Sequence, residues 1–394
     1  MHDLICISHL RWDFVWQRPQ HLLSRLAQQH PLLFVEEPVT DTEIKDPYLE
    51  TYPGRTPGAH GDGAATVTVA RLHYPSQDHY WIGYNDARTQ RCYEKLLLEY
   101  LTHRGSPNPL LWLYTPMGAP FVETLQPRLL IYDVMDELSA FKGAPADLKE
   151  ADRRLLQQAD LVFTGGLSVY QARQPYHDNI HLFPSGIEID HFARAATEAF
   201  ARPADMAELA APLLGYFGVI DERMDLPLLA HVAAAHPEWN LVMVGPVIKI
   251  APDELPQAPN LHYLGMKDYA DLPAYLAHFD VTLVPFAMNE ATRYLSPTKT
   301  LEYLAAHKPV VSTPIPDIIA LYGDYVHIGH TPDEFVTQVE KALTRDAAEQ
   351  AQRRAQEKRL LAQHTWDRIA AQMQQLIAQN SRRRMENAEA VVRA

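Results

Sequence analysis

Residues 296–306 combine the start of a predicted helix with a lysine that could bind a phosphorylated ligand. Ser296 is a favoured N-cap residue and Pro297 suits the first helical position, so the pattern predicts that Lys299 is the third helical residue. A cation at the positive end of a helix dipole is unfavourable by roughly a few tenths of a kcal/mol. It becomes favourable when an external phosphate binds there, because the free N–H groups and the ammonium attract the same anion.

Glu302 follows Lys299 at the i, i+3 spacing, which places both side chains on one face of the predicted helix. A carboxylate set one turn behind a phosphate site could accept hydrogen bonds from two vicinal hydroxyls, such as those of a ribose. The simpler interpretation is a solvated ion pair between the two side chains. The Ser-Pro start and the β-branched strand predicted at residues 310–313 favour a ligand site.

A second group of polar and aromatic side chains follows the first predicted strand, residues 4–8. His9, Trp12 and Arg18 would lie at the carboxyl end of this strand, where open α/β sheets bind ligands. We therefore predict that they bind an acceptor molecule; an equally weighted alternative is that the tryptophans only cover the sheet edge. No Gly-x-Gly-x-x-Gly follows the strand and the chain has no Gly-Lys-Ser/Thr, so the nicotinamide and P-loop interpretations lose their main support.

Short apolar runs alternate with amphipathic stretches along the chain, which is typical of doubly wound α/β domains. Residues 40–80 are predicted to form loops and short strands, and residues 193–211 a linker or an exposed helical crossover. From residue 331 the pattern is helical to the end. The predicted strands are residues 4–8, 32–36, 65–72, 110–114, 129–132, 161–164, 181–183, 213–218, 241–245, 261–264, 281–285 and 310–313.

Length and composition exclude several classes of protein. A chain of 394 residues fits two domains, and the net charge of −14 argues against a nucleic-acid-binding protein. Two cysteines provide neither a disulfide framework nor a metal-ligand cluster, which suits a reducing cytoplasm. We find no signal peptide and no apolar run of about 18 residues. Arg382, Arg383 and Arg384 are interpreted as a solvated tail, with a peripheral contact to anionic lipid at the inner face of the membrane left open.

The segment Ser-Pro-Thr-Lys-x-x-Glu-Tyr-Leu-Ala-Ala-x-Lys-Pro-Val-Val, which begins at Ser296, resembles the donor-binding helix of GT-B glycosyltransferases of the family 4-like, retaining type. The resemblance implies that Glu302 holds the ribose of a nucleotide-sugar and that Lys299 meets its diphosphate. We place Ser296 and Thr298 in the same donor site. The family motif usually has another Glu eight residues before Glu302, where this chain has Tyr294.

The resemblance also bears on residues outside the helix. In the family, the Glu at the position of Tyr294 contacts the transferred sugar. Here a neighbour such as Asn289 or Glu290 would supply that contact. Gly218 matches the glycine that lets the backbone approach the diphosphate, and Arg223 matches a basic residue that contacts it. The alternative for Arg223 is a salt bridge with Asp221 or Asp225.

An acidic loop after the strand at 129–132 completes the set of candidate residues. Similar Asp-containing loops occur at this point in the family, and Asp136 is our candidate for a contact near the reacting centre. Helix capping by Asp136 or Glu137 is at least as good an interpretation of the residues themselves.

Taken together, the resemblance implies an α/β protein of GT-B fold, with two Rossmann-like doubly wound domains facing a central cleft. Residues 1–195 would form the acceptor-side domain, with a C-terminal helix at 366–394 packing back on it. Residues 212–365 would form the donor domain.

The implied activity is transfer of a hexose from a nucleoside-diphosphate sugar, of the UDP or GDP type, to a hydroxyl of a carbohydrate or lipid-linked acceptor. We expect retention at the anomeric carbon, no metal and no cofactor, and a place in bacterial surface polysaccharide or glycoconjugate synthesis. Asp136, Arg223 and Lys299 are the predicted catalytic residues, the two cations by stabilising the departing diphosphate. The alternatives are a nucleotide-sugar epimerase of the same fold and a non-catalytic nucleotide-sugar-binding partner.

Overall fold

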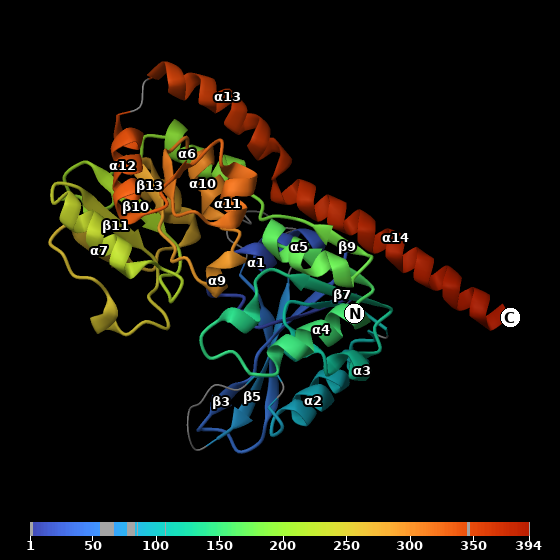
Figure 1. Cartoon of the computed structure of the whole chain (residues 1–394). Coiled ribbons are helices and arrows are strands. Elements are labelled where there is room, and N and C mark those ends of the chain that lie inside the picture. The colour runs from blue at the N-terminus through green and yellow to red at the C-terminus, as the bar shows by residue number, and fades with distance from the viewer. Residues whose placement is uncertain are drawn as a thin grey trace. The chain divides into compact units, whose positions relative to one another are not determined.

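Two β-sheets, each in its own unit, organise the chain, and nearly all of their strand pairs are parallel (Figure 1). The computed structural model describes residues 3–55, 67–76, 83–84, 86–106, 108–344 and 347–393. Unit 1 consists of Met1–Gly165, Val169–Phe183 and Asp367–Ala394, and unit 2 of Gly166–Ser168 and Pro184–Trp366. Each unit is described separately below.

The sheet of unit 1 has nine strands among the described residues, in the order β3-β5-β2-β1-β6-β7-β8-β9, with β4 paired to β5. All pairs are parallel except β4 with β5. The central strands are buried along their whole length, as expected for strands covered on both faces. The strands are β1 (Leu4–Ser8), β2 (Leu32–Glu36), β3 (Val39–Asp41), β4 (Tyr48–Pro53), β5 (Thr68–Pro75), β6 (Leu110–Leu113), β7 (Leu129–Val134), β8 (Leu161–Thr164) and β9 (Ile180–Leu182).

Amphipathic helices connect these strands, as the crossovers of a parallel sheet require. In α1 (Arg18–Leu26), the predicted apolar stripe of Leu22, Leu23 and Leu26 is buried. The other helices of this unit are α2 (Gln90–His103), α3 (Phe121–Leu125), α4 (Leu148–Gln158), most of α5 (Leu167–Arg173), nearly all of α14 (Trp366–Arg393) and the short η1 (Pro116–Gly118), η2 (Leu138–Ala140) and η3 (Gln174–Tyr176).

Helix α14 continues through the segment that we interpreted as a solvated tail. Arg382, Arg383 and Arg384 are exposed helical residues, and the Arg384 guanidinium pairs with the Asp160 carboxylate of unit 1. Their exposure agrees with that interpretation, and the helix continues to Arg393 beyond the apolar stripe in which Ile369, Met373 and Ile377 are buried.

The sheet of unit 2 has six described strands in the order β12-β11-β10-β13-β14-β15, all parallel. Numbered along the unit, this order is 3-2-1-4-5-6, the order of a doubly wound dinucleotide-binding fold. The direction of winding reverses between β10 and β13, so loops after these two strands border the crevice where such sheets bind ligands. The strands are β10 (Leu213–Phe217), β11 (Asn240–Val244), β12 (Leu261–Gly265), β13 (Val281–Val284), β14 (Val310–Ser312) and β15 (His327–Ile328).

The helices of unit 2 form two packed groups, α7 with α12 and α10 with α6 and α13, while α6 also packs on α8. Right-handed crossovers in a sheet of this order place the α7 and α10 connections on opposite faces. The helices are α6 (Ile189–Thr197), α7 (Leu226–Ala235), α8 (Leu272–Ala277), α9 (Glu290–Arg293), α10 (Lys299–Ala305), α11 (Pro316–Tyr322), α12 (Pro332–Leu343), α13 (Ala347–Gln363) and the short η4 (Ala204–Met206), η5 (Pro252–Glu254) and η6 (Tyr269–Asp271).

The boundary that we predicted at residue 195 falls inside α6, which belongs to unit 2. The side chain of Phe192 explains this placement: it is fully buried and stacks on Phe217 of β10 with ring centroids 5.8 Å apart. The segment at 193–211 therefore begins as part of a packed helix rather than as a linker. Two of the residues in the strand predicted at 65–72 lie outside the described residues.

Membrane-spanning helices and metal-ligand clusters are both absent from the described part of the chain. None of its helices is long and apolar enough to cross a membrane. No three His, Cys, Asp or Glu side chains within it are grouped so that they could hold a metal ion.

Candidate functional site

Three glycines end three adjacent strands at the carboxyl edge of the unit 2 sheet. Gly218 follows β10, Gly245 follows β11 and Gly265 ends β12, with φ angles of 136°, 147° and 69°. Their backbones are in close contact: a Cβ atom on Gly245 would lie 1.9 Å from the Gly218 carbonyl oxygen, and the Gly245 N–H donates to the Gly265 carbonyl at 2.9 Å. Only glycine fits such a conformation and such an approach without strain, so this edge is bare backbone that a ligand can approach closely.

Lys299 extends over this edge from α10. A Cβ atom on Gly218 would lie 2.1 Å from Lys299 Cε and 2.6 Å from Nζ, so the missing side chain is what leaves room for the lysine. The ammonium also lies 5.6 Å from the centroid of the Tyr216 ring. The structure therefore brings Gly218 and Lys299 together, although they are far apart in the sequence.

Helix α10 begins later than we predicted. Its first residue is Lys299 and its N-cap is Thr298, whose carbonyl accepts from the N–H groups of Leu301 and Glu302 at 3.1 and 3.3 Å. The prediction of Ser296 as the N-cap is therefore wrong, because the first carbonyl that closes a helical turn is that of Thr298. Lys299 keeps its i, i+3 relation to Glu302, and Ser296 and Thr298 lie half-buried just before the helix.

Glu302 is a partly buried carboxyl rather than one member of a solvated ion pair. Burial raises its pKa to about 7 and the nearby Glu188 carboxylate adds to the rise, while Lys299 opposes it. The Glu188 carboxylate itself accepts a hydrogen bond from the Tyr269 hydroxyl at 2.8 Å. Glu302 is thus influenced by an ammonium and by a second carboxylate, an arrangement that suits a ligand offering both hydroxyl donors and negative charge.

We expect the ionisation of Glu302 to make the folded protein less stable as the pH rises. Its folded pKa of about 7 is above the ordinary value of 4.5, so the folded protein retains a proton that the unfolded chain releases between these values. Stability should therefore fall as the pH rises through that window and level off above it. Glu302→Gln should stabilise the protein by up to about 3 kcal/mol at about pH 8 and have little effect near pH 4.

Chemical denaturation across this pH range measures the effect. Glu208→Gln, at an exposed position of the same unit, is the matched control and should leave the pH profile unchanged. If the free energies of unfolding of the parent and of Glu302→Gln changed in parallel with pH, the expected rise in the pKa of Glu302 would be contradicted.

Arg223 makes the salt bridge that we considered as the alternative to ligand binding. Its Nε donates to Asp221 Oδ1 at 2.9 Å, and its Nη2 donates to Asp221 Oδ2 at 2.6 Å. Asp225 is used elsewhere, because its Oδ1 caps α7 by accepting from the Leu228 N–H at 2.9 Å. The Asp221 contacts use the Nε–Nη2 edge of the guanidinium, and they orient the arginine beside the loop that follows Gly218.

The loop between β13 and α10 holds the remaining donor-site candidates. Asn289 is exposed and caps α9, its Oδ1 accepting from the Thr292 N–H at 3.1 Å. Tyr294 ends the same short helix, and the Arg293 guanidinium lies 5.6 Å from its ring centroid. The Ala287 N–H donates to the Arg223 carbonyl at 2.8 Å, which ties this loop to the segment that carries the arginine.

In unit 1, the structure does not support a ligand-binding role for two of the three acceptor candidates. Trp12 is 1% exposed, packs against Phe34, and donates from Nε1 to the Arg55 carbonyl at 2.8 Å. Arg18 is 2% exposed, and its donors are used by Asp133 and the Phe183 carbonyl. Both side chains therefore stabilise unit 1. For Trp12 this is the alternative that we considered, in which the tryptophan covers the sheet edge.

His9 and Asp136 remain accessible at the carboxyl edge of the unit 1 sheet, where both are half-buried. Asp136 follows β7, and its neighbour Glu137 is held by the Arg173 guanidinium at 2.9 Å and the Ser139 hydroxyl at 2.6 Å. Glu137 therefore anchors the loop instead of capping a helix backbone, since η2 has no side-chain cap.

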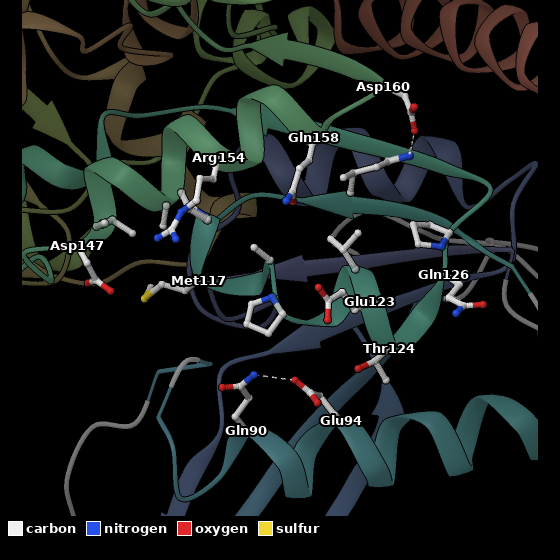
Figure 2. A pocket seen from close by; sticks show the side chains of 18 of the residues that line it. Gln90, Glu94, Met117, Glu123, Thr124, Gln126, Asp147, Arg154, Gln158 and Asp160 are labelled. Carbon is white, nitrogen blue, oxygen red and sulfur yellow. Dashed lines mark hydrogen bonds between the residues drawn. The ribbon is translucent and has the colours of Figure 1, made fainter.

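A pocket of about 820 Å³ lies among the helices of unit 1 (Figure 2). Figure 2 shows Gln90 and Glu94 of α2 on one side, hydrogen-bonded at 2.9 Å, and Arg154 and Gln158 of α4 on the other. The pocket extends to Asp160, which precedes β8 and is therefore at the amino edge of the sheet. None of the predicted site residues lines it.

Sequence reasoning missed Tyr216 and Glu188 as members of the donor-side group. Tyr216 is fully buried inside a predicted strand, so its pattern indicates only a core residue. The sequence around Glu188 carried no prediction of a ligand contact. The structure places both near Lys299 or Glu302.

Comparisons with known proteins agree with this geometry. Residues 225–375 match a family model described as glycosyl transferase-like. A Bacillus subtilis (strain 168) protein described as a teichuronic acid biosynthesis glycosyltransferase, TuaH, is 26% identical over 259 residues, or 61% of this chain. The chain spans 64% of the length of that relative.

Solved structures show the same fold along nearly the whole chain. Sucrose-phosphate synthase from Thermosynechococcus elongatus matches with a TM-score of 0.69 and 17% identity, covering 96% of this chain and 99% of that one. A trehalose 6-phosphate synthase from Burkholderia multivorans matches with a TM-score of 0.64 and 15% identity, covering 98% and 100%. An E. coli structure described as trehalose-6-phosphate bound with UDP-2-fluoro glucose matches with a TM-score of 0.67 and 15% identity. The match covers 96% of this chain and 98% of that one.

The two Rossmann-like units, these fold matches and the family match over most of unit 2 agree with one another. The chain therefore has the GT-B fold, and residues 225–375 are similar to the glycosyl transferase-like family.

Proposed function

We propose that the chain is a glycosyltransferase that moves a sugar from a nucleoside-diphosphate sugar to an acceptor hydroxyl. The observation that carries the proposal is the position of Lys299 Nζ over the bare backbone at Gly218, beside Glu302 and the loop of Arg223. A diphosphate bound on that backbone would meet two cations, and the adjacent ribose would offer its two hydroxyls to Glu302.

This arrangement assigns a role to each residue in the transfer. Lys299 and Arg223 stabilise the negative charge that develops on the departing diphosphate, the guanidinium by contacting two phosphate oxygens. Gly218 lets the backbone approach the phosphates. Transfer with retention needs no dedicated base where the departing phosphate oxygen takes the proton of the acceptor hydroxyl, and we propose that mechanism, without a metal. We retain Asn289 and Asp136 as candidates for contacts to the transferred sugar and the acceptor.

The donor and acceptor classes follow from the relatives. UDP-2-fluoro glucose in the E. coli structure favours a UDP-sugar, and the teichuronic acid description of the Bacillus relative favours a bacterial surface polysaccharide as the product. We propose a carbohydrate or lipid-linked acceptor bound near His9, and a cytoplasmic enzyme in peripheral contact with the membrane through the basic residues of α14.

Thermal stabilisation by a panel of nucleoside diphosphates and their sugars tests the binding part of the proposal, since a ligand that binds the folded state raises the melting temperature. We expect stabilisation by a ribonucleoside diphosphate and less by its 2′-deoxy counterpart. Glu302→Ala should remove that difference, because the carboxylate no longer accepts from the ribose hydroxyls.

Incubation of the stabilising nucleotide-sugar with and without acceptor extracts tests the reaction. Consumption that requires acceptor supports the transferase. Isomerisation of the sugar without acceptor would indicate an epimerase, and binding without turnover would indicate a non-catalytic partner. Absence of stabilisation by every nucleotide would refute the proposed function.

A further inference from the structure

Tyr216 lies at the centre of the group that we propose binds the diphosphate, although it is fully buried and cannot contact a ligand in solution directly. It is the fourth residue of β10, and its ring packs edge-on against Phe286 after β13, with centroids 6.1 Å apart. Tyr216 is thus on one of the two strands where the winding of the sheet reverses, and its ring contacts a residue that follows the other.

The ring of Tyr216 contacts the lysine of the site. Lys299 Nζ lies 5.6 Å from the ring centroid, within the range in which the π-face of an aromatic ring attracts a cation. Lysine side chains have several rotatable bonds, so an ammonium without such a contact samples many positions. The ring restricts Lys299 to the position over Gly218.

The hydroxyl of Tyr216 holds the loop that carries the arginine. It donates to the Val219 carbonyl at 2.8 Å. A Cβ atom on Gly218 would lie 3.1 Å from the Tyr216 hydroxyl oxygen. This bond fixes the chain just after the strand, in the positive-φ turn that leads to Asp221 and Arg223. One side chain thus contacts both halves of the proposed phosphate site.

We propose that Tyr216 is a positioning residue that holds Lys299 through its ring, and the loop of Arg223 through its hydroxyl, in the arrangement that binds a diphosphate. The inference deepens the proposed function and rests on it. Burial raises the pKa of the Tyr216 hydroxyl most, Arg223 lowers it, and Asp221 and Glu302 raise it further, so three charged groups of the site act on this side chain.

A double-mutant cycle tests whether Tyr216 acts through Lys299. The dissociation constant of a nucleoside diphosphate is measured for Tyr216→Phe and Tyr216→Leu, each with Lys299 and with Lys299→Ala. Both variants lack the hydroxyl that bonds to Val219, so the comparison isolates the aromatic ring. We expect Tyr216→Leu to bind about 10-fold more weakly than Tyr216→Phe when Lys299 is present, and less than about 2-fold more weakly in the Lys299→Ala background. Equal differences in the two backgrounds would overturn the inference, because they would show that the ring does not act through Lys299.

Tyr275→Leu is the matched control. Tyr275 is also buried in unit 2 and also lies beneath a lysine, with Lys267 Nζ 5.7 Å from its ring centroid, but it is on α8 and bonds to Asp205. It should change the diphosphate affinity by less than about 2-fold, whatever its effect on stability.

A ligand-free measurement separates this inference from the proposed function. After reductive ¹³C-methylation of the lysines, the Lys299 resonance, identified by its loss in Lys299→Ala, should show an upfield ring-current shift in the parent and in Tyr216→Phe. It should move toward the position of exposed lysines in Tyr216→Leu. An unchanged resonance in Tyr216→Leu would overturn the inference alone, whereas a parent that binds no diphosphate would overturn the proposed function and this inference together.

Discussion

Lys299→Ala is expected to weaken the binding of nucleoside diphosphates by about 100-fold or more while leaving the fold intact. A hydrogen bond from a charged group contributes roughly 1.5–3 kcal/mol, and about 2.7 kcal/mol corresponds to a 100-fold change in affinity. The half-buried side chain crosses Gly218 at the sheet edge, so its removal leaves the core packing unchanged. Calorimetric titration of the nucleotide that gives the largest thermal stabilisation measures the loss.

Two variants serve as controls for this result. Lys341→Ala removes an exposed lysine from α12 of the same unit and should bind the nucleotide as the parent does. Lys299→Arg keeps the charge and should retain part of the affinity. If Lys299→Ala binds as tightly as the parent, Lys299 does not belong to the site and the donor assignment fails.

Arg18→Met is expected to destabilise the protein by about 3–5 kcal/mol, the cost of leaving a buried carboxylate without its partner. The side chains of Arg18 and Asp133 are 3% and 0% exposed, and Nη2 donates to Oδ1 at 2.9 Å. Nη1 donates to the Phe183 carbonyl at 2.7 Å, so the same guanidinium joins α1, β7 and the end of β9. Urea unfolding monitored by tryptophan fluorescence measures the change.

The same helix offers the control for this variant. Arg25 of α1 pairs with Asp367 at 2.6 Å, but that carboxylate is 82% exposed, and exposed pairs contribute at most about 1 kcal/mol. Arg25→Met should therefore cost much less than Arg18→Met. The double variant Arg18→Met, Asp133→Leu should recover much of the loss, since it removes the unpaired charge. Equal destabilisation by the two single variants would contradict a buried ion pair.

Much of the fold could be predicted because buried parallel strands are continuous apolar runs, which can be recognised from a short stretch of sequence. The predicted bounds of β1, β2 and β8 agree with the structure, and the other nine predicted strands differ from it by one to three residues at an end. The short strands β3, β4 and β15 were not predicted individually. The Ser-Pro pattern led to an early start for α10, because capping preferences do not reveal which carbonyl closes the first turn.

The roles of charged side chains were harder to predict. Arg18 and Asp133 are 115 positions apart, so nothing near Arg18 in the sequence shows that its charge is matched inside the domain. For Arg223, the partner Asp221 was visible at two residues' distance, yet the resemblance favoured a contact to the diphosphate over the salt bridge that the structure contains.

The sequence by itself determined the α/β class, the presence of two domains and the segment in which Lys299 and Glu302 lie, since each depends on short patterns of apolarity and spacing. Only the tertiary structure decided that Lys299 crosses Gly218, that Tyr216 lies beneath it and that Glu302 is buried enough to change its pKa. These properties depend on which strands are neighbours in the sheet, and strand order brings together residues that no local pattern connects.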